Sequence, residues 1–164
     1  MDAIAPQDSP GAVGLAVASP TTQADEWETQ QVVVRFTAHF DAVEGDRMEQ
    51  YFAPAAVWYQ PRGPVRGRAE LRERMAAFPR DVTMRHVITN LRTSFLGPDD
   101  ALVESYFTLY KGTRVQSGEE AVITHGPKNV GRYHDRLRRI DGRWLLDERR
   151  VTFDFSLPDA PEGH

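Results

Sequence analysis

The sequence predicts one α+β domain: a cone-shaped, strongly curved and mostly antiparallel sheet, with three N-terminal helices that enclose a pocket against it. Two observations predict this fold class. Apolar residues recur at helical spacing before Val82 and alternate with polar residues after it. The dipeptide Asp141-Gly142 joins the last two alternating segments, as in a two-residue hairpin turn. A curved sheet covered by helices leaves a cavity, and such cavities usually hold small ligands.

The first half of the domain is expected to be mainly helical. The expected elements, in chain order, are a helix over 25–43, a short helix from Asp46 to before Pro54, a strand over 55–60 and a helix over 68–78. Asp25 and Asp46 are suited to cap the two helices that they begin, because a carboxylate accepts hydrogen bonds from free backbone N–H groups there. Gly45 is expected to end the first helix.

The second half is expected to form a meander of long strands. The alternating segments cover 82–96, 101–110, 130–140 and 143–155, with a short strand or edge over 121–124. The folded domain is therefore expected to span 25–156. Residues 1–24 and 157–164 have the composition of disordered tails.

The composition excludes several classes of protein. The chain has 164 residues, a net charge of −4 and no cysteine, which rules out disulfide scaffolds and thiol nucleophiles. The sequence has no cluster of basic residues of the kind that binds nucleic acid, and it has no apolar run long enough to cross a membrane. The short apolar run over 11–18 has no basic residue before it, so we expect a cytoplasmic protein rather than a secreted one. The histidines lack metal-ligand spacing, so no metal site is expected.

His86 and Asp41 are the main candidates for chemistry. His86 lies in the middle of an expected strand, where alternation places Met84, Ile88 and Asn90 on its face. Imidazole is easily tuned to act as an acid or base near neutral pH, although a hydrogen-bonded structural histidine is the alternative. Asp41 lies in the last turn of the first helix. Beside an imidazole it would fix the tautomer, whereas otherwise it is a solvated carboxylate at a helix end.

Other candidates for the pocket are aromatic or acidic. Trp58, Tyr59, Tyr106 and Tyr133 either line the pocket or belong to the core. Asp135 alternates with apolar residues on one strand face, so it either pairs with Arg149 or another strand arginine, or it is functional.

Several local patterns occur in an order typical of a known family. They are Asp41 near the first helix end, Phe52-Ala53-Pro54-Ala55-Ala56-Val57-Trp58, Gly67-Arg68-Ala69-Glu70-Leu71, Arg85-His86-x-x-Thr89-Asn90, Gly131-x-Tyr133-x-Asp135-x-Leu137, Asp141-Gly142-x-Trp144 and Arg149. Over roughly residues 26–155 the chain resembles the nuclear transport factor 2-like superfamily, in its SnoaL-like branch. This fold hosts many activities, so the resemblance implies the fold more strongly than the function.

Two groups of relatives imply different functions. The sequence is similar to hexachlorocyclohexane dehydrochlorinase and scytalone dehydratase, which use an Asp–His arrangement for proton abstraction and elimination. Asp41, Trp58 and His86 look like the catalytic Asp, the pocket Trp and the catalytic His of the dehydrochlorinase. The match is imperfect, because Thr89-Asn90 follows His86 one residue sooner than in that enzyme. Where ketosteroid isomerases place a base aspartate, this chain has Gln60. The chain also resembles the β subunit of aromatic-ring-hydroxylating dioxygenases, which is mainly structural and carries no redox cofactor.

These similarities lead to one main expectation and two alternatives. We expect a cofactor-free lyase or isomerase that acts on a small, apolar cyclic substrate. Its catalytic residues would be Asp41 and His86, and its substrate-binding residues would be Trp58, Tyr59, Asn90, Tyr106, Tyr133 and Asp135. The alternatives are a non-catalytic β-type dioxygenase subunit bound to an α subunit, or a ligand-binding domain.

A further expectation concerns assembly. A meander covered by helices on one side leaves its other face free, so we expect a homodimer or homotrimer through that face. Leu145, Val151 and Phe153 share one strand parity and are candidates for this interface.

Overall fold

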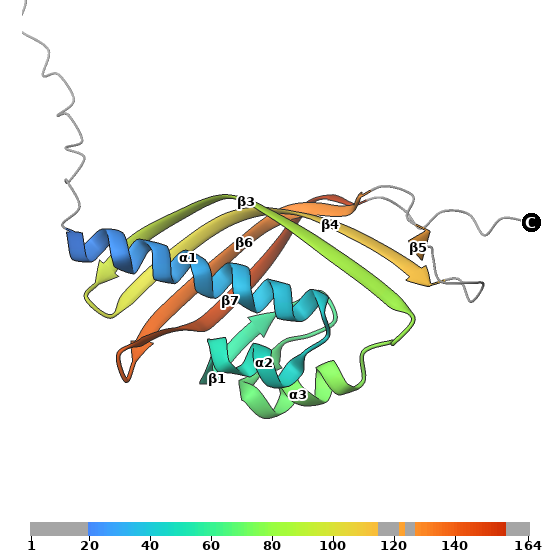
Figure 1. Cartoon of the computed structure of the whole chain (residues 1–164), viewed down its shortest axis with the longest axis horizontal. Coiled ribbons are helices and arrows are strands. Elements are labelled where there is room, and N and C mark those ends of the chain that lie inside the picture. The colour runs from blue at the N-terminus through green and yellow to red at the C-terminus, as the bar shows by residue number, and fades with distance from the viewer. Residues whose placement is uncertain (1–19, 115–121, 124–126, 157–164) are drawn as a thin grey trace, which may run out of the picture.

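The computed structural model describes residues 20–114, 122–123 and 127–156 (Figure 1). The described residues form three α-helices, one short 3-10 helix and seven strands. In chain order these are α1 (Pro20–Asp41), α2 (Gly45–Met48), the 3-10 helix Glu49–Tyr51, β1 (Phe52–Tyr59), β2 (Val65–Arg66), α3 (Gly67–Ala76), β3 (Val82–Gly97), β4 (Asp100–Arg114), β5 (Val122–Ile123), β6 (Pro127–Ile140) and β7 (Arg143–Ser156).

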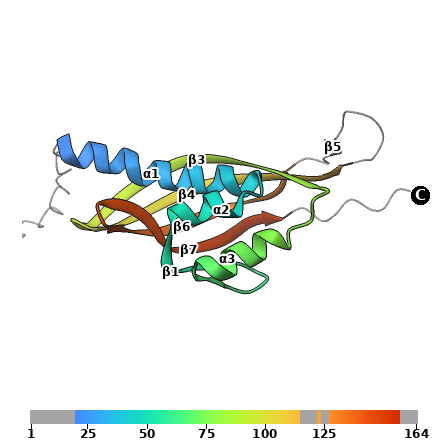
Figure 2. The same cartoon turned by 60° about the horizontal axis from the view of Figure 1, so that its bottom comes forward.

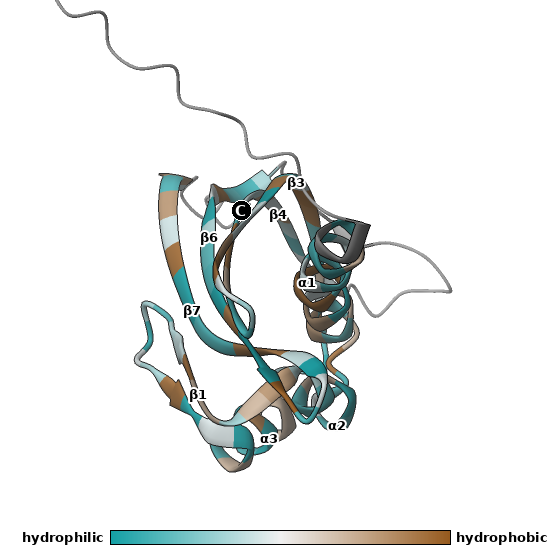
Figure 3. Cartoon of the chain, turned by 90° about the vertical axis from the view of Figure 1, so that its left-hand side faces the viewer, coloured by the Kyte–Doolittle hydropathy of each residue, from teal (hydrophilic) through white to brown (hydrophobic). Residues whose placement is uncertain are grey.

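The strands form one curled, mostly antiparallel sheet in the order β2-β1-β7-β6-β4-β3, with β5 paired to β4. The pairing of β1 with β7 is parallel, because the chain crosses from one end of the sheet to the other between them. Helix α1 lies along the concave side, and α2 and α3 gather with β1 near its C-terminal end (Figures 1 and 2). Viewed from its side, the sheet curls around α1 without closing into a barrel (Figure 3). The α+β class predicted from the sequence is therefore confirmed.

The hydrophobic core lies between α1 and the concave face of the sheet. Val33 and Phe36 of α1 are fully buried, as are Phe52 and Ala56 of β1 and Leu146 of β7. Helix α1 thus packs on strands that are far apart in the sequence. No helix in the described part of the chain is both long and apolar enough to cross a membrane.

The helix ends differ from the sequence expectations. Helix α1 begins at Pro20 rather than Asp25, with proline at a first-turn position where its missing N–H costs little. Asp25 therefore lies inside the helix, where its carboxylate accepts a 3.3 Å hydrogen bond from Trp144 Nε1 and pairs with Arg139 at 2.7 Å. The expected cap at Asp46 was also wrong, because α2 begins at Gly45 and has no side-chain cap.

Gly45 does not end α1 either. The helix ends at Asp41, and Val43 makes the turn with a φ of 57°. The short second helix is also shorter than expected, because Phe52 already belongs to β1. The early end of α1 places Asp41 at its final position, where its side chain extends toward the sheet edge.

Two of the register shifts in the long strands bear on the concave side. A β-bulge interrupts the β3–β4 register between Thr89 and Arg92, and Asn90 adopts a left-handed φ of 54°. A second bulge lies at Gly131, where a Cβ atom would collide with the Thr152 carbonyl oxygen and the Phe107 ring. Glycine at this position lets the Phe107 side chain pack directly against the β6 backbone.

The outer face of the sheet carries several cross-strand ion pairs. Arg92 pairs with Glu104 at 2.9 Å, and Arg132 pairs with Asp154 at 2.7 Å. Leu145, one of the residues predicted for an interface there, is buried and belongs to the hydrophobic core. Val151 and Phe153 line a cavity on the concave side. These three residues therefore do not supply an outer interface, and the expected assembly stays a prediction.

Candidate active site

A cavity of about 230 Å³ opens on the concave side, between the end of α1, β1, the end of α3 and the long strands. Its apolar wall includes Phe40, Trp58, Phe78, Met84, Phe107 and Val151. Tyr133 and Gln60 add polar groups to the wall. The charged side chains that line it, among the residues the structure describes, are Arg62, Lys111 and Lys128. The cavity wall is therefore mainly apolar, and the charged side chains that line it are all positive.

Asp41 and His86 meet beside this cavity. The Oδ1 atom of Asp41 lies 2.6 Å from Nδ1 of His86, and Oδ2 accepts a 2.7 Å hydrogen bond from the His86 backbone N–H. The backbone contact is available because β3 is an edge strand and α1 ends over it. Only 3% of the His86 side chain and 11% of the Asp41 side chain are exposed. Both carboxylate oxygens are thus committed to one residue, which fixes the orientation of the imidazole.

Aromatic residues of the cavity wall surround the imidazole. Its ring centroid lies 5.4 Å from that of Phe40, 6.0 Å from Phe107 and 6.4 Å from Tyr133. Because Asp41 occupies Nδ1, Nε2 is the ring nitrogen left to accept or release a proton. The imidazole therefore packs against the aromatic wall of an apolar cavity and is held in one tautomer, which is the arrangement that a general base requires.

A second acidic residue lies deeper in the same region. Asp135 is fully buried and receives two hydrogen bonds from Arg149, at 2.8 Å from Nε and 2.7 Å from Nη2. Arg149 also donates a 3.3 Å bond to Thr37 on α1. Burial alone would lower the pKa of Arg149, but the Asp135 carboxylate and its hydrogen bonds raise that pKa above the ordinary value. Of the alternatives for Asp135, the structure thus shows pairing with Arg149, and the guanidinium remains charged.

Tyr133 connects this ion pair to the cavity. The Arg149 guanidinium lies 4.1 Å from the centroid of the Tyr133 ring, and that ring stacks on Phe107 at 4.5 Å. Burial raises the pKa of the Tyr133 hydroxyl well above its ordinary value. The hydroxyl therefore stays neutral at physiological pH and remains a hydrogen-bond donor.

The structure separates the residues predicted to bind substrate. Trp58 and Tyr133 line the cavity. Asn90 and Tyr106 instead line a different depression of about 180 Å³, because the bulge at Asn90 removes that residue from the face of His86. Tyr59 lies under Arg150, whose guanidinium is 4.2 Å from the ring centroid, and the Asp135 carboxylate is held by the buried arginine.

Sequence reasoning did not assign Phe40 or Gln60 to the pocket. A signal for Gln60 was present, since it follows Trp58 by two residues in the strand expected over 55–60 and would share its face there. No comparable signal marks Phe40, whose position depends on how α1 crosses the sheet.

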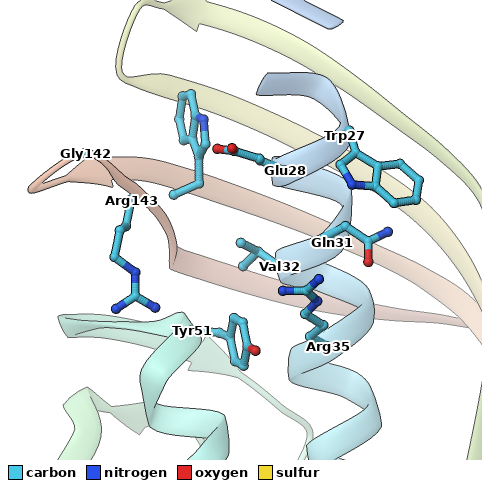
Figure 4. A pocket seen from close by; sticks show the side chains of 9 residues that line it. Trp27, Glu28, Gln31, Val32, Arg35, Tyr51, Gly142 and Arg143 are labelled. Atoms are coloured by element: carbon cyan, nitrogen blue, oxygen red, sulfur yellow. The ribbon is translucent and has the colours of Figure 1, made fainter. Parts of the chain in front are cut away.

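A larger depression of about 440 Å³ lies at the other end of the fold (Figure 4). It is bordered by α1 and the turn between β6 and β7, with Trp27, Arg35 and Arg143 among the side chains around it. Trp27 is 63% exposed. This depression lacks the Asp–His contact that distinguishes the smaller cavity, so the smaller cavity is the better candidate for an active site.

Comparisons with known proteins agree with this architecture. Residues 21–150 match the family model described as a SnoaL-like domain. A protein of unknown function with a cystatin-like fold from Nostoc punctiforme PCC 73102 has 26% identity and a TM-score of 0.67, with 84% of this chain and 96% of that chain covered.

Two further structures bear names that describe a reaction. A candidate scytalone dehydratase from Novosphingobium aromaticivorans DSM 12444 has 19% identity and a TM-score of 0.64, covering 88% of this chain and 97% of that one. A type 2 hexachlorocyclohexane dehydrochlorinase has 17% identity and a TM-score of 0.66, covering 87% and 97%. At these identities both show the fold alone. No curated protein matches the sequence. The family match spans most of the chain, and the chain therefore belongs to the SnoaL-like domain family, with the nuclear transport factor 2-like fold.

Proposed function

We propose that this protein is a cofactor-independent lyase or isomerase that acts on a small single-ring substrate in the 230 Å³ cavity. The observation that carries the proposal is the 2.6 Å contact between Asp41 and His86, whose imidazole packs against Phe40 and Phe107 of the cavity wall. An apolar space with few polar groups and an oriented acid–base pair is the usual form of a small-molecule active site.

The proposed reaction begins with proton abstraction. Nε2 of His86 takes a proton from a ring carbon, and the electron pair of the broken C–H bond forms a new C=C bond. In a lyase the neighbouring leaving group departs with the electron pair of its bond to carbon. In an isomerase the new C=C bond displaces the π pair of a neighbouring double bond, and the proton returns to the carbon at the far end of the shifted pair. Asp41 stabilises the imidazolium that forms between these steps, because its carboxylate accepts the hydrogen bond from the Nδ1 proton.

Cavity size and lining support a single-ring substrate. An engineered apolar cavity of about 150 Å³ accommodates benzene, so this cavity has room for one ring and a substituent. Phe40 and Phe107 offer flat surfaces against which a ring can lie. The neutral Tyr133 hydroxyl is a candidate donor to a departing group. The fold similarity to a dehydrochlorinase and a candidate dehydratase is consistent with elimination chemistry.

The test compares two histidine variants over a panel of cyclic ketones, alcohols and halides, with products detected by mass spectrometry and deuterium uptake from D₂O. His86→Ala should reduce turnover by about 10²–10⁴-fold, the usual contribution of a general base. His134→Ala is the control, because His134 is on the outer face and 41% of its side chain is exposed. Equal turnover in the His86 variant and the wild type would contradict the proposal. A wild type that binds a panel member without converting it would favour a ligand-binding domain.

A further inference from the structure

Two hydrogen-bond donors on the cavity wall have no partner. The indole Nε1 of Trp58 and the amide Nε2 of Gln60 are buried atoms without a hydrogen-bond acceptor in the described part of the protein. Buried donors are almost always paired, because leaving one unpaired forfeits its hydrogen bonds to water. Both residues line the 230 Å³ cavity. An acceptor from outside the protein is therefore the natural partner of these two groups.

The two donors lie at the end of β1. Trp58 belongs to this strand, Gln60 directly follows its last residue, and both side chains line the same cavity. The indole is held edge-on between Phe36, at 5.6 Å, and Phe40, at 5.0 Å between ring centroids. These contacts restrict rotation of the indole toward another acceptor. The donors are thus held at the β1 wall, before any ligand arrives.

Phe40 lies between this wall and the histidine. Its ring contacts Trp58 on one side and His86, at 5.4 Å, on the other. A ring that packs against Phe40 would therefore present one part to the imidazole and another part to the two donors.

We propose that Trp58 Nε1 and Gln60 Nε2 form a two-donor subsite that selects single-ring substrates bearing a hydrogen-bond acceptor, with a ring carbonyl as the best fit. This inference rests on the proposed function, since it takes the cavity to be the substrate site. The subsite sets specificity: it binds a carbonyl oxygen and discriminates against a hydrocarbon of the same shape, which would leave both donors unpaired.

The test uses two probes of nearly the same shape, cyclohexanone and methylenecyclohexane, which differ in whether C=O or C=CH₂ is attached to the ring. Binding is followed by NMR titration of ¹⁵N-labelled protein. The chain has 3 tryptophans, and the indole signal lost in Trp58→Phe identifies Trp58. In the wild type this signal should shift with cyclohexanone and not with methylenecyclohexane. The exposed Trp27 and Trp144, which already donates to Asp25, are internal references.

The wild type should bind cyclohexanone about 3- to 10-fold more tightly than methylenecyclohexane, the usual effect of one or two neutral hydrogen bonds. Gln60→Met and Trp58→Phe should each move that ratio toward one while the hydrocarbon still binds. Tyr59→Phe is the matched control, because Tyr59 lies between them in sequence and packs under Arg150 instead. Gln60→Met keeps the test decisive if the core variant Trp58→Phe fails to fold.

Equal binding of the two probes by the wild type, no binding of cyclohexanone, or a ratio that neither variant changes would overturn the inference. His86→Gln separates it from the proposed function, because this variant should keep the ketone preference. If His86→Gln lowers turnover but Gln60→Met leaves the ketone preference unchanged, the proposed function stands and the two-donor subsite is wrong. If Gln60→Met lowers the ketone preference but His86→Gln leaves turnover unchanged, the subsite stands and the proposed function is wrong.

Discussion

Two acid–base pairs lie within the same concave region, and they differ in what surrounds them. Asp135 and Arg149 are both 0% exposed, and each oxygen of the carboxylate faces a guanidinium nitrogen. Asp41 and His86 keep 11% and 3% of their side chains exposed, and the imidazole packs against aromatic residues that line the cavity. Asp135 and Arg149 face each other across the β6–β7 hairpin, whereas Asp41 and His86 are 45 residues apart.

The difference separates a structural pair from one suited to chemistry. A guanidinium does not release its proton near neutral pH, and Arg149 is additionally committed to Thr37 and to the faces of two aromatic rings. An imidazole can exchange a proton, and one of its nitrogens remains outside the contact with Asp41. Similar distances therefore imply different roles, because the chemistry of the cation decides whether the pair can change its charge.

Breaking the buried pair should have the largest effect on stability. In Arg149→Met the Asp135 carboxylate is left buried without a counter-charge, so the free energy of unfolding should fall by about 3–5 kcal/mol. Urea denaturation followed by circular dichroism measures this change. The double variant Asp135→Leu/Arg149→Met should recover much of the loss, because it removes both charges together. A loss of less than about 1 kcal/mol in the single variant would show that the pair is not needed for the fold.

The substitution of aspartate by asparagine should have different effects in the two pairs. In Asp41→Asn the new side-chain amide would present an N–H to Nδ1 of the imidazole, which would move the ring proton to Nε2 and block that nitrogen as a base. We expect turnover of a substrate found by the panel to fall by about 10²-fold or more, with a small change in unfolding free energy. Asp135→Asn should instead act mainly on stability.

The ¹⁵N chemical shifts of the His86 ring provide a second readout for Asp41→Asn. They should report a change of tautomer in that variant and none in Asp135→Asn. Unchanged ring shifts together with unchanged turnover would remove Asp41 from the proposed positioning role.

The smallest effect on stability is expected from the removal of an ion pair on the outer face, that of Asp100 and Arg136. The hydrogen bond from Arg136 lowers the pKa of Asp100 below its ordinary value of 3.8, although partial burial opposes this. The folded state therefore holds fewer protons at this site than the unfolded state, so the stabilisation is present above the ordinary value and is lost as pH falls through the lowered pKa. Because the pair is near solvent, it should contribute under about 1 kcal/mol.

Urea midpoints measured from pH 7 to pH 2 test this contribution. Asp100→Asn should be slightly less stable than the wild type at pH 7, and the two should converge at the acid end of the range. A gap that widens toward low pH would contradict the sign of the pKa shift.

Much of the fold was predictable from local patterns. The change of apolar period near Val82 places the boundary between helices and meander, and β3 begins at that residue. The Asp141-Gly142 turn joins β6 to β7 as expected, with φ values of 50° and 74°. Pairing with Arg149 was one of the alternatives for Asp135, because a carboxylate on an apolar strand face needs a counter-charge when buried. These features depend on neighbouring residues or on a general requirement for charge compensation.

The site was less predictable, since its residues come from separate elements. Spacing alone left His86 and Asp41 with structural alternatives, and their association drew on the family resemblance. Asn90 shares the parity of His86 in the sequence but not its face in the structure, because a one-residue bulge reverses the alternation. Local periodicity cannot reveal such a bulge, since it is specified by how β3 pairs with β4.

The sequence by itself therefore determined the α+β class, the order of the elements and the kinds of chemistry available, because periodicity, turn residues and side-chain type are local properties. Only the tertiary structure decided which groups meet. Asp41 reaches His86 across 45 residues because α1 ends over the edge strand β3. Phe40, Trp58 and Gln60 share a cavity because α1 crosses the sheet beside β1. Such contacts arise when elements pack into a common core, and packing depends on all of the elements together.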